Sequence, residues 1–271
     1  MSEFLIRFGE GFNWGYSPIT QIGEKPADVG INFGILKLRA GDRYSGNAAF
    51  EEALLLMSGS VMFRFGDTES TVSRSSIFEE NPFVLHHAAG SSVRVIAQLD
   101  SELAIFQVPN SKEFSTMLFD SKNMLESEHR DKGLLDDTSY RIVRTVFDLR
   151  NRPNALLVLG EVINFPGRWS SYPPHHHPQP EIYHYRFTHP HGYGHCEIGE
   201  QVLKVREFDT VKILDLRDHS QVAAPGYGMY YLWVIRHLAG NPYTIPEFTE
   251  EHRWLKSPDA EVWRPSVMSS R

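Results

Sequence analysis

Histidines gather in one short stretch of this chain. Seven of the thirteen histidines lie between residues 175 and 195, and the first three are consecutive. Side chains alternate along a β-strand, so His175 and His177 would project from one face and His176 from the other. Glu181 follows after two prolines that bend the chain, and it can return a carboxylate oxygen to the same point. The pattern His-x-His-x3-Glu therefore predicts a site for a divalent transition metal.

The elements that would position these side chains are short and mostly β. Apolar stretches of four to eight residues recur between Gly, Asn, Asp, Ser and Pro, with little helical periodicity. Many short strands at this spacing favour a sandwich or a barrel. We predict strands over residues 31–38, 53–57, 61–65, 76–78, 83–85, 93–97, 103–108, 140–147, 155–165, 205–214 and 228–235.

A polar, charged stretch over 111–137 divides the chain into two similar halves. We interpret it as a connector with one short helix. Residues 1–138 then form an N-terminal β half plus this connector. Residues 139–271 form a C-terminal half that carries the histidines and ends in an irregular tail, which begins at Pro242 and packs onto the body.

Composition excludes several classes of partner. The 271 residues are 41% hydrophobic and 23% charged, with a net charge of -7 and no basic block, so we expect neither nucleic acid nor anionic lipid as a partner. No apolar run approaches the roughly eighteen residues of a membrane helix, and the acidic start is unlike a signal peptide. Cys196 is the only cysteine, which fits a reducing cytoplasm. A small-molecule partner is the expectation.

The arrangement of the ligand pattern within two β halves resembles a bicupin, a chain of two tandem jelly-roll-like β-barrel domains. In cupins a histidine from a later strand joins three earlier ligands, and His219 stands 38 residues after Glu181. The resemblance thus implies a metal shell of His175, His177, Glu181 and His219. Such a shell suits Zn, Mn, Fe or Ni. Exposed bicupin faces also imply a homo-oligomer.

The residues that lead into the histidines narrow the resemblance. Trp-Ser-Ser-Tyr-Pro-Pro-His over 169–175 closely resembles the signature of the 5-deoxy-glucuronate isomerase family of inositol catabolism. Similar segments occur across about residues 28 to 240, including Phe78-Glu79-Glu80-Asn81-Pro82. The resemblance implies a metal-dependent aldose-ketose isomerase that converts the sugar acid 5-deoxy-glucuronate into 2-deoxy-5-keto-gluconate. The alternatives are an isomerase of a related uronate of the 4-deoxy-5-hexosulose-uronate type, a metal-dependent cupin dioxygenase, and a non-catalytic sugar-acid-binding cupin.

The chain departs from the family pattern close to the ligands. The family usually has Lys between the two histidines and Asp after them, where this chain has His176 and Pro178. Cys196 and Glu197 stand where the family tends to carry Gln-Arg, and Arg168 stands where Asn is more typical. The predicted metal shell is kept while the lining of the predicted pocket differs.

Tyrosines and acids near the ligands are candidates for substrate chemistry. Tyr183 and Tyr185 share the parity of Glu181, so they should point into the barrel, either as core packing or to bind substrate. Tyr172 lies just ahead of the ligands and is a further substrate-binding candidate. For the proton-transfer base, Tyr185, Glu197 and a metal-bound hydroxide all stay open.

Arginines are candidates to hold the substrate carboxylate, because a guanidinium pairs with a carboxylate in bidentate fashion. Arg168 and Arg206 are the two that we assign to substrate binding, against the commoner fate of a solvated surface position. The first half lacks a His-x-His pattern, and the adjacent His86 and His87 would diverge on a strand. We therefore predict a first half without metal, which serves in packing and oligomer formation.

Overall fold

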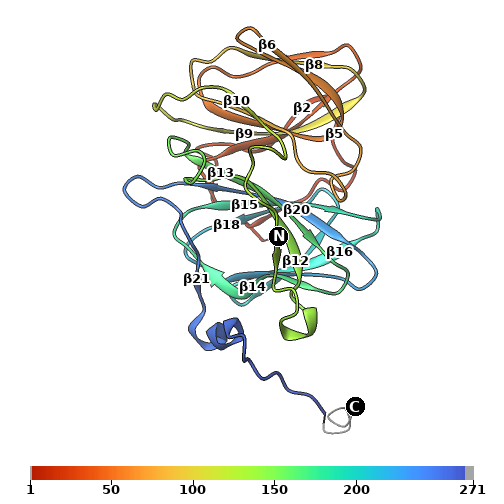
Figure 1. Cartoon of the computed structure of the whole chain (residues 1–271), viewed down its shortest axis with the longest axis vertical. Helices are drawn as coiled ribbons and strands as arrows, with labels where there is room; N and C mark the ends of the chain where they lie inside the picture. Colours follow the sequence, from red (N-terminus) through yellow and green to blue (C-terminus); the bar gives the residue numbers. More distant parts are fainter. Residues whose placement is uncertain (1, 266–271) are drawn as a thin grey trace.

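The computed structural model describes residues 2–265 and shows a mainly β molecule in two stacked halves (Figure 1). The sheet of the first half consists of β2 (Gly15–Thr20), β3 (Asn32–Leu38), β4 (Arg43–Ser45), β5 (Glu51–Phe65), β6 (Thr68–Arg74), β7 (Val84–His87), β8 (Val93–Ala97), β9 (Ser101–Val108) and β10 (Met117–Phe119). This half occupies the upper part of Figure 1.

Two sheets build the second half. The larger consists of β1 (Leu5–Ile6), β11 (Glu128–Arg130), β12 (Arg141–Phe147), β13 (Leu157–Asn164), β15 (Glu181–Phe187), β18 (Thr210–Ile213) and β20 (Met229–Arg236). The smaller consists of β14 (Trp169–His176), β16 (Tyr193–Ile198), β17 (Gln201–Arg206), β19 (His219–Ala223) and β21 (Glu247–Phe248). Short 3-10 helices are η1 (Leu135–Asp137) and η2 (Glu250–Lys256). Among residues 2–265, none of the helices has the length and apolar character needed to cross a membrane.

The long strand β5 pairs with two different sets of neighbours in the first half. Its beginning pairs with β7 and β9, and its end pairs with β6 and β8. The strand bends near Gly59, whose φ is +100° and where a Cβ would stand 2.4 Å from the carbonyl oxygen of Asp100. Only glycine meets both conditions without strain. The strands predicted over 53–57 and 61–65 are thus one bent strand.

A shared apolar core joins the two halves. Along β5, Leu54 and Leu56 face the interior of the first half, whereas Leu55 faces the second half. There it belongs to the same buried cluster as Leu159 of β13 and Leu232 of β20. Because alternate side chains of the facing sheets fill this layer, both halves depend on it for burial.

The connector and the N-terminus contribute strands to the second half. Within 111–137, β10 pairs with β7 of the first half and β11 pairs with β12 of the second. At the N-terminus, β1 pairs with β18 of the second half. The division of the chain at residue 138 stays a prediction. Two strands from before this residue, β1 and β11, pair with strands of the second half.

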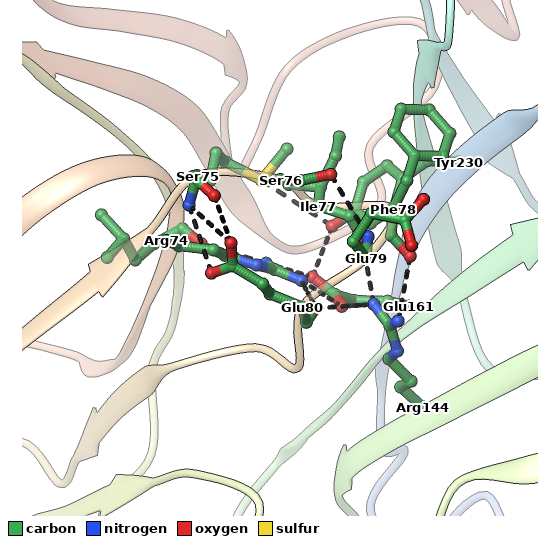
Figure 2. Close-up of polar contacts among 12 residues, drawn as sticks. Arg74, Ser75, Ser76, Ile77, Phe78, Glu79, Glu80, Arg144, Glu161 and Tyr230 are labelled. Carbon is green, nitrogen blue, oxygen red and sulfur yellow. Dashed lines mark hydrogen bonds and ion pairs between the residues drawn. The ribbon is translucent and has the colours of Figure 1, made fainter.

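Buried charges also connect the halves (Figure 2). The Arg74 guanidinium of the first half donates to both carboxylate oxygens of Glu161 on β13, at 2.7 and 2.8 Å, and neither side chain is exposed to solvent. The Tyr230 hydroxyl of β20 donates to the same carboxylate at 2.7 Å. Arg144 of β12 donates to the carbonyl oxygens of Ile77, Phe78 and Glu80, which fixes the segment before β7.

Two expectations about local structure were wrong. The segment 76–78, expected as a strand, is a turn, because its carbonyls face Arg144 instead of a neighbouring strand. The stretch 205–214 is not one strand; it contains the end of β17 and all of β18, separated by a turn at Phe208, whose φ is +68°. The tail from Pro242 packs onto the body as predicted, because β21 pairs with β14 and Arg264 donates to Asp136 of η1, but it is not irregular throughout, since it contains β21 and η2.

Candidate metal centre

Three buried side chains bring their ligand atoms together in the second half. One ligand atom each from His177, Glu181 and His219 lies within 4.8 Å of the others. Glu181 begins β15, His219 begins β19, and His177 directly follows β14. The two sheets that carry them face each other, so residues far apart in sequence meet at one end of the sandwich. The Nε2 atoms of His177 and His219 lie 3.1 and 3.5 Å from Glu181 Oε2.

Three histidines of this region are oriented by backbone carbonyls. Nδ1 of His175, His177 and His219 lies 3.3, 2.9 and 3.1 Å from a carbonyl oxygen two residues away in sequence. A carbonyl oxygen only accepts hydrogen bonds, so Nδ1 carries the proton in all three rings and donates it. In the neutral ring Nε2 then keeps its lone pair, as metal-binding histidines require.

Burial favours the neutral rings. It lowers the pKa of His219 to about 4 and, with the neighbouring His219 and His177, lowers the pKa of His175 well below its usual range. His219 Nε2 is buried and has no hydrogen-bond partner among the described residues. An unsatisfied buried acceptor is costly unless a proton or a cation faces it. The donor set of imidazole nitrogens and a carboxylate oxygen therefore fits a divalent transition metal.

His175 lies beside this trio, and His176 points away from it. The ring centroid of His175 is 4.4 Å from that of His219 and 6.5 Å from that of His177. His175 lines the cavity described below, but it is not among the three residues whose ligand atoms lie within 4.8 Å of one another. His176 is partly exposed, and its Nδ1 lies 2.7 Å from an Asp218 carboxylate oxygen on the outer face.

A cavity of about 630 Å³ opens beside the cluster, and His175, His177 and Glu181 line it. Its wall carries the cationic residues Arg130, Arg141, Arg150 and Lys256. It also carries the hydroxyl groups of Ser170, Ser171, Tyr183, Tyr231, Tyr243 and Thr244. The acidic residues Glu128, Asp148 and Glu181 also line it, so the four cationic side chains exceed the acidic ones by one. This volume matches a small polar ligand, and the small excess of positive charge favours an anionic one.

The hydroxyl groups form a connected network on one wall. The Ser171 hydroxyl lies 3.3 Å from the Tyr183 hydroxyl and 3.4 Å from that of Tyr231, which also bonds Ser170. Ser171 has a φ of +51°, at the register shift of β14 between Ser170 and His175. Strained residues and bulges are frequent at functional sites because they redirect side chains. Burial raises the pKa of Tyr183 well above its usual range, so this phenol is a hydrogen-bond donor.

The two side chains considered as bases from sequence do not line the cavity among the described residues. The Tyr185 hydroxyl is buried and donates to the Gln221 side-chain oxygen. Glu197 accepts a hydrogen bond from the Ser220 hydroxyl in the opposed strand β19. Tyr172 packs against Trp169 in a tilted arrangement with ring centroids 5.3 Å apart, and it also does not line the cavity.

The arginines chosen from sequence also lie elsewhere. The Arg168 guanidinium lies 5.3 Å from the ring centroids of both Tyr140 and Phe165, and Arg206 is exposed on β17. The structure brings Arg130 and Arg141 to the cavity instead. Arg141 shares a face of β12 with Val143, which also lines the cavity. The alternation of the predicted strand 140–147 could have revealed Arg141, whereas no local signal marks Arg130 on the connector.

The first half has a different polar cluster at a comparable place. Glu52 at the start of β5 faces the interior, as Glu181 does in β15. His87 Nε2 lies 3.0 Å from its carboxylate, and the Tyr44 hydroxyl and the Gln107 amide donate to it at 2.8 and 2.6 Å. One histidine stands at this carboxylate, whereas two stand at that of Glu181. A first half without metal stays a prediction.

Comparison with known families decides the classification. Residues 4–255 match the KduI/IolB family. The chain belongs to this family. KduI/IolB relatives include the 5-deoxy-glucuronate isomerase of Shouchella clausii, 27% identical over 250 residues that cover 84% of this chain and 88% of the relative. The 5-deoxy-glucuronate isomerase of Lacticaseibacillus casei is 28% identical over 227 residues, 76% of this chain and 80% of the relative. The family resemblance predicted from 169–175 is thus confirmed.

Solved structures confirm the cupin fold. An IolB-like protein from Salmonella typhimurium superposes with a TM-score of 0.81 at 22% identity, covering 94% of this chain and 100% of that one. A cupin 2 conserved barrel domain protein from Leptotrichia buccalis gives 0.53 at 12% identity, covering 86% and 96%. The oxalate decarboxylase of Lactobacillus farciminis gives 0.67 at 12% identity, covering 95% and 91%. The predicted jelly-roll fold is therefore correct, although the sheets of this KduI/IolB member are open and do not close into barrels.

Proposed function

We propose that this chain is a metal-dependent aldose-ketose isomerase that converts 5-deoxy-glucuronate into 2-deoxy-5-keto-gluconate in inositol catabolism. The observation that carries the proposal is the buried trio of His177, Glu181 and His219, with its unpartnered Nε2 atom, at the wall of a cation-lined cavity. The choice of 5-deoxy-glucuronate as substrate rests on the relatives that are named 5-deoxy-glucuronate isomerases.

In this proposal His177, Glu181 and His219 hold the metal, and His175 completes the shell. When bound, a divalent metal acts as a Lewis acid that polarises a carbonyl and acidifies the neighbouring C–H bond of a sugar. The carbonyls that accept from the histidine Nδ1 atoms keep the rings oriented before substrate arrives. This fixed geometry reduces the reorganisation that binding would otherwise require.

The hydroxyl network would orient the sugar beside the metal. Tyr183 stays protonated because burial raises its pKa, so it can donate a hydrogen bond to a substrate oxygen on which negative charge develops. The Ser171 hydroxyl lies within hydrogen-bond distance of the hydroxyls of both Tyr183 and Tyr231. These three groups can therefore form a hydrogen-bonded chain along the wall. Tyr185 and Glu197 do not line the cavity, so we propose that the proton-transfer base is another group, one that lines it.

The cationic wall would bind the carboxylate end of the substrate. Arg141 is almost fully buried and is fixed by Asp131 and by the carbonyl oxygen of Ser139 at 2.8 Å. A guanidinium held in this way presents its remaining N–H groups to a carboxylate in a fixed direction. Asp131 offsets the charge of Arg141, so this residue would contribute directed hydrogen bonds to the carboxylate of a uronate rather than an unpaired positive charge.

The test is an assay of purified protein on 5-deoxy-glucuronate, with the product followed by proton NMR and oxygen followed with an electrode. We expect conversion to 2-deoxy-5-keto-gluconate, no oxygen uptake, and loss of activity after dialysis against a chelator with recovery on adding metal. Oxygen consumption would indicate a dioxygenase, and binding without turnover would indicate a sugar-acid sensor. Either result would overturn the proposal.

A further inference from the structure

The tail after β20 builds one wall of the cavity. Residues 243–256, which we name the closing segment, contribute six lining side chains: Tyr243, Thr244, Ile245, Pro246, Phe248 and Lys256. It is anchored on the strand that carries His175, because the Thr249 amide and hydroxyl both donate to the Pro174 carbonyl oxygen at 3.0 Å. Within β21, Phe248 pairs directly with His175.

The closing segment also touches the candidate metal ligands through its rings. The Tyr243 ring centroid is 4.9 Å from that of His177, and the Phe248 ring centroid is 5.8 Å from that of His175. The Lys256 ammonium in turn lies 5.1 Å from the centroid of Phe248. The Phe248 ring is thus close both to the His175 ring and to the Lys256 ammonium, and all three residues line the same cavity.

Lys256 differs from the other cations of the cavity in its partners. Arg130 donates to Glu128 at 2.8 Å, Arg150 lies 2.8 Å from Asp148, and Arg141 is bonded to Asp131. These three guanidinium charges are already compensated.

The nearest carboxylate oxygen to the Lys256 ammonium, that of Asp131, is 3.7 Å away, too far for a hydrogen bond. Within residues 2–265 the structure gives this ammonium no hydrogen-bond acceptor, and its side chain is 41% exposed. Three N–H donors are therefore available to an anion that enters the cavity.

We infer that Lys256 binds the substrate carboxylate and that the closing segment makes the enzyme specific for sugar acids. The inference rests on the proposed function and assigns one binding role within that site. The sugar would reach from the metal ligands on β14 and β15 to the ammonium at the end of η2. Phe248 would shield the space between from water, which strengthens the ion pair.

The test compares steady-state kinetics of Lys256→Met, Lys256→Arg and Arg253→Met on 5-deoxy-glucuronate and on its 6-carboxamide. Loss of a charge-assisted hydrogen bond should raise KM for the acid about ten-fold in Lys256→Met, with a small change in kcat. Lys256→Arg should restore KM. The KM for the uncharged carboxamide should be the same in wild type and Lys256→Met.

Arg253→Met is the matched control, because Arg253 lies on the same helix, is 53% exposed and does not line the cavity. An equal rise of KM in this variant, or an equal rise for the carboxamide in Lys256→Met, would show a structural role and overturn the inference.

Failure of the proposed function is separable from failure of this inference. If wild type does not turn over 5-deoxy-glucuronate, calorimetric binding of D-glucuronate decides the role of Lys256. About ten-fold weaker binding by Lys256→Met supports the inference. Equal affinity, or no binding by either protein, overturns it.

Discussion

Replacing Glu161 with Gln should lower the free energy of unfolding more than a Glu-to-Gln substitution at an exposed position. Glu161 lies between two guanidinium groups, with Arg74 bonded at 2.7 and 2.8 Å and Arg144 at 3.7 Å (Figure 2). Gln keeps the shape of the side chain and can still accept the hydrogen bond from the Tyr230 hydroxyl. It removes the fully buried negative charge that lies between the two guanidinium groups. Both guanidinium groups then remain in the contact between the two halves without compensation.

The magnitude follows from burial. Arg74 and Glu161 are both 0% exposed, so solvent does not screen the uncompensated charge. Breaking a buried pair by removing one partner costs about 3 to 5 kcal/mol. For a chain of this size that corresponds to a fall in Tm of about 6 to 20 °C.

The assay is urea-induced unfolding followed by circular dichroism, with Glu69→Gln as the matched control. Glu69 pairs with Arg64 at 2.6 Å, but the two side chains are 54% and 42% exposed, so this control should lose less than about 1 kcal/mol. A Glu161→Gln variant as stable as Glu69→Gln would refute the reasoning that the buried pair holds the halves together.

Three further predictions concern packing, reactivity and binding. Gly46→Ala should lose about 1 to 3 kcal/mol of unfolding free energy in the same assay, since its Cβ would stand 2.3 Å from a Val93 methyl group; Gly9→Ala, with open space around it, should be neutral. Burial raises the pKa of Cys196 to about 12, so iodoacetamide at pH 8 should leave the native protein unlabelled by mass spectrometry and modify it only after unfolding; labelling of native protein would contradict this. Arg141→Met should raise KM for 5-deoxy-glucuronate about ten-fold or more, and Arg206→Met less than about two-fold; the reverse order would contradict the cavity assignment.

Local sequence patterns predicted the strands and part of the site. Alternation of apolar residues located most strands, because burial of one face imposes a period of two. It failed at 76–78, where Arg144 takes the backbone carbonyls that a strand would use. It also failed at 205–214, where the Asp209 carboxylate accepts the Arg206 amide at 2.9 Å and closes a turn inside an apolar pattern.

The residues of the metal trio could be predicted from the sequence more fully than those of the cationic wall. His177 and Glu181 are close in sequence, so spacing alone suggested that they meet. His219 needed the family resemblance, because only the packing of two sheets brings it to them. Arg130 and Lys256 come from the connector and the tail, and their position depends on strand pairings of β11 and β21 that no local pattern encodes.

The most direct test of the metal centre is elemental analysis of purified wild type, His177→Ala and His219→Ala by plasma mass spectrometry, with exposed His195→Ala as the control. We predict about one divalent metal ion per chain in wild type and in His195→Ala, and loss of the metal in the other two variants with folding preserved. Full metal content in both His177→Ala and His219→Ala, or a wild-type protein that binds none, would contradict the assignment.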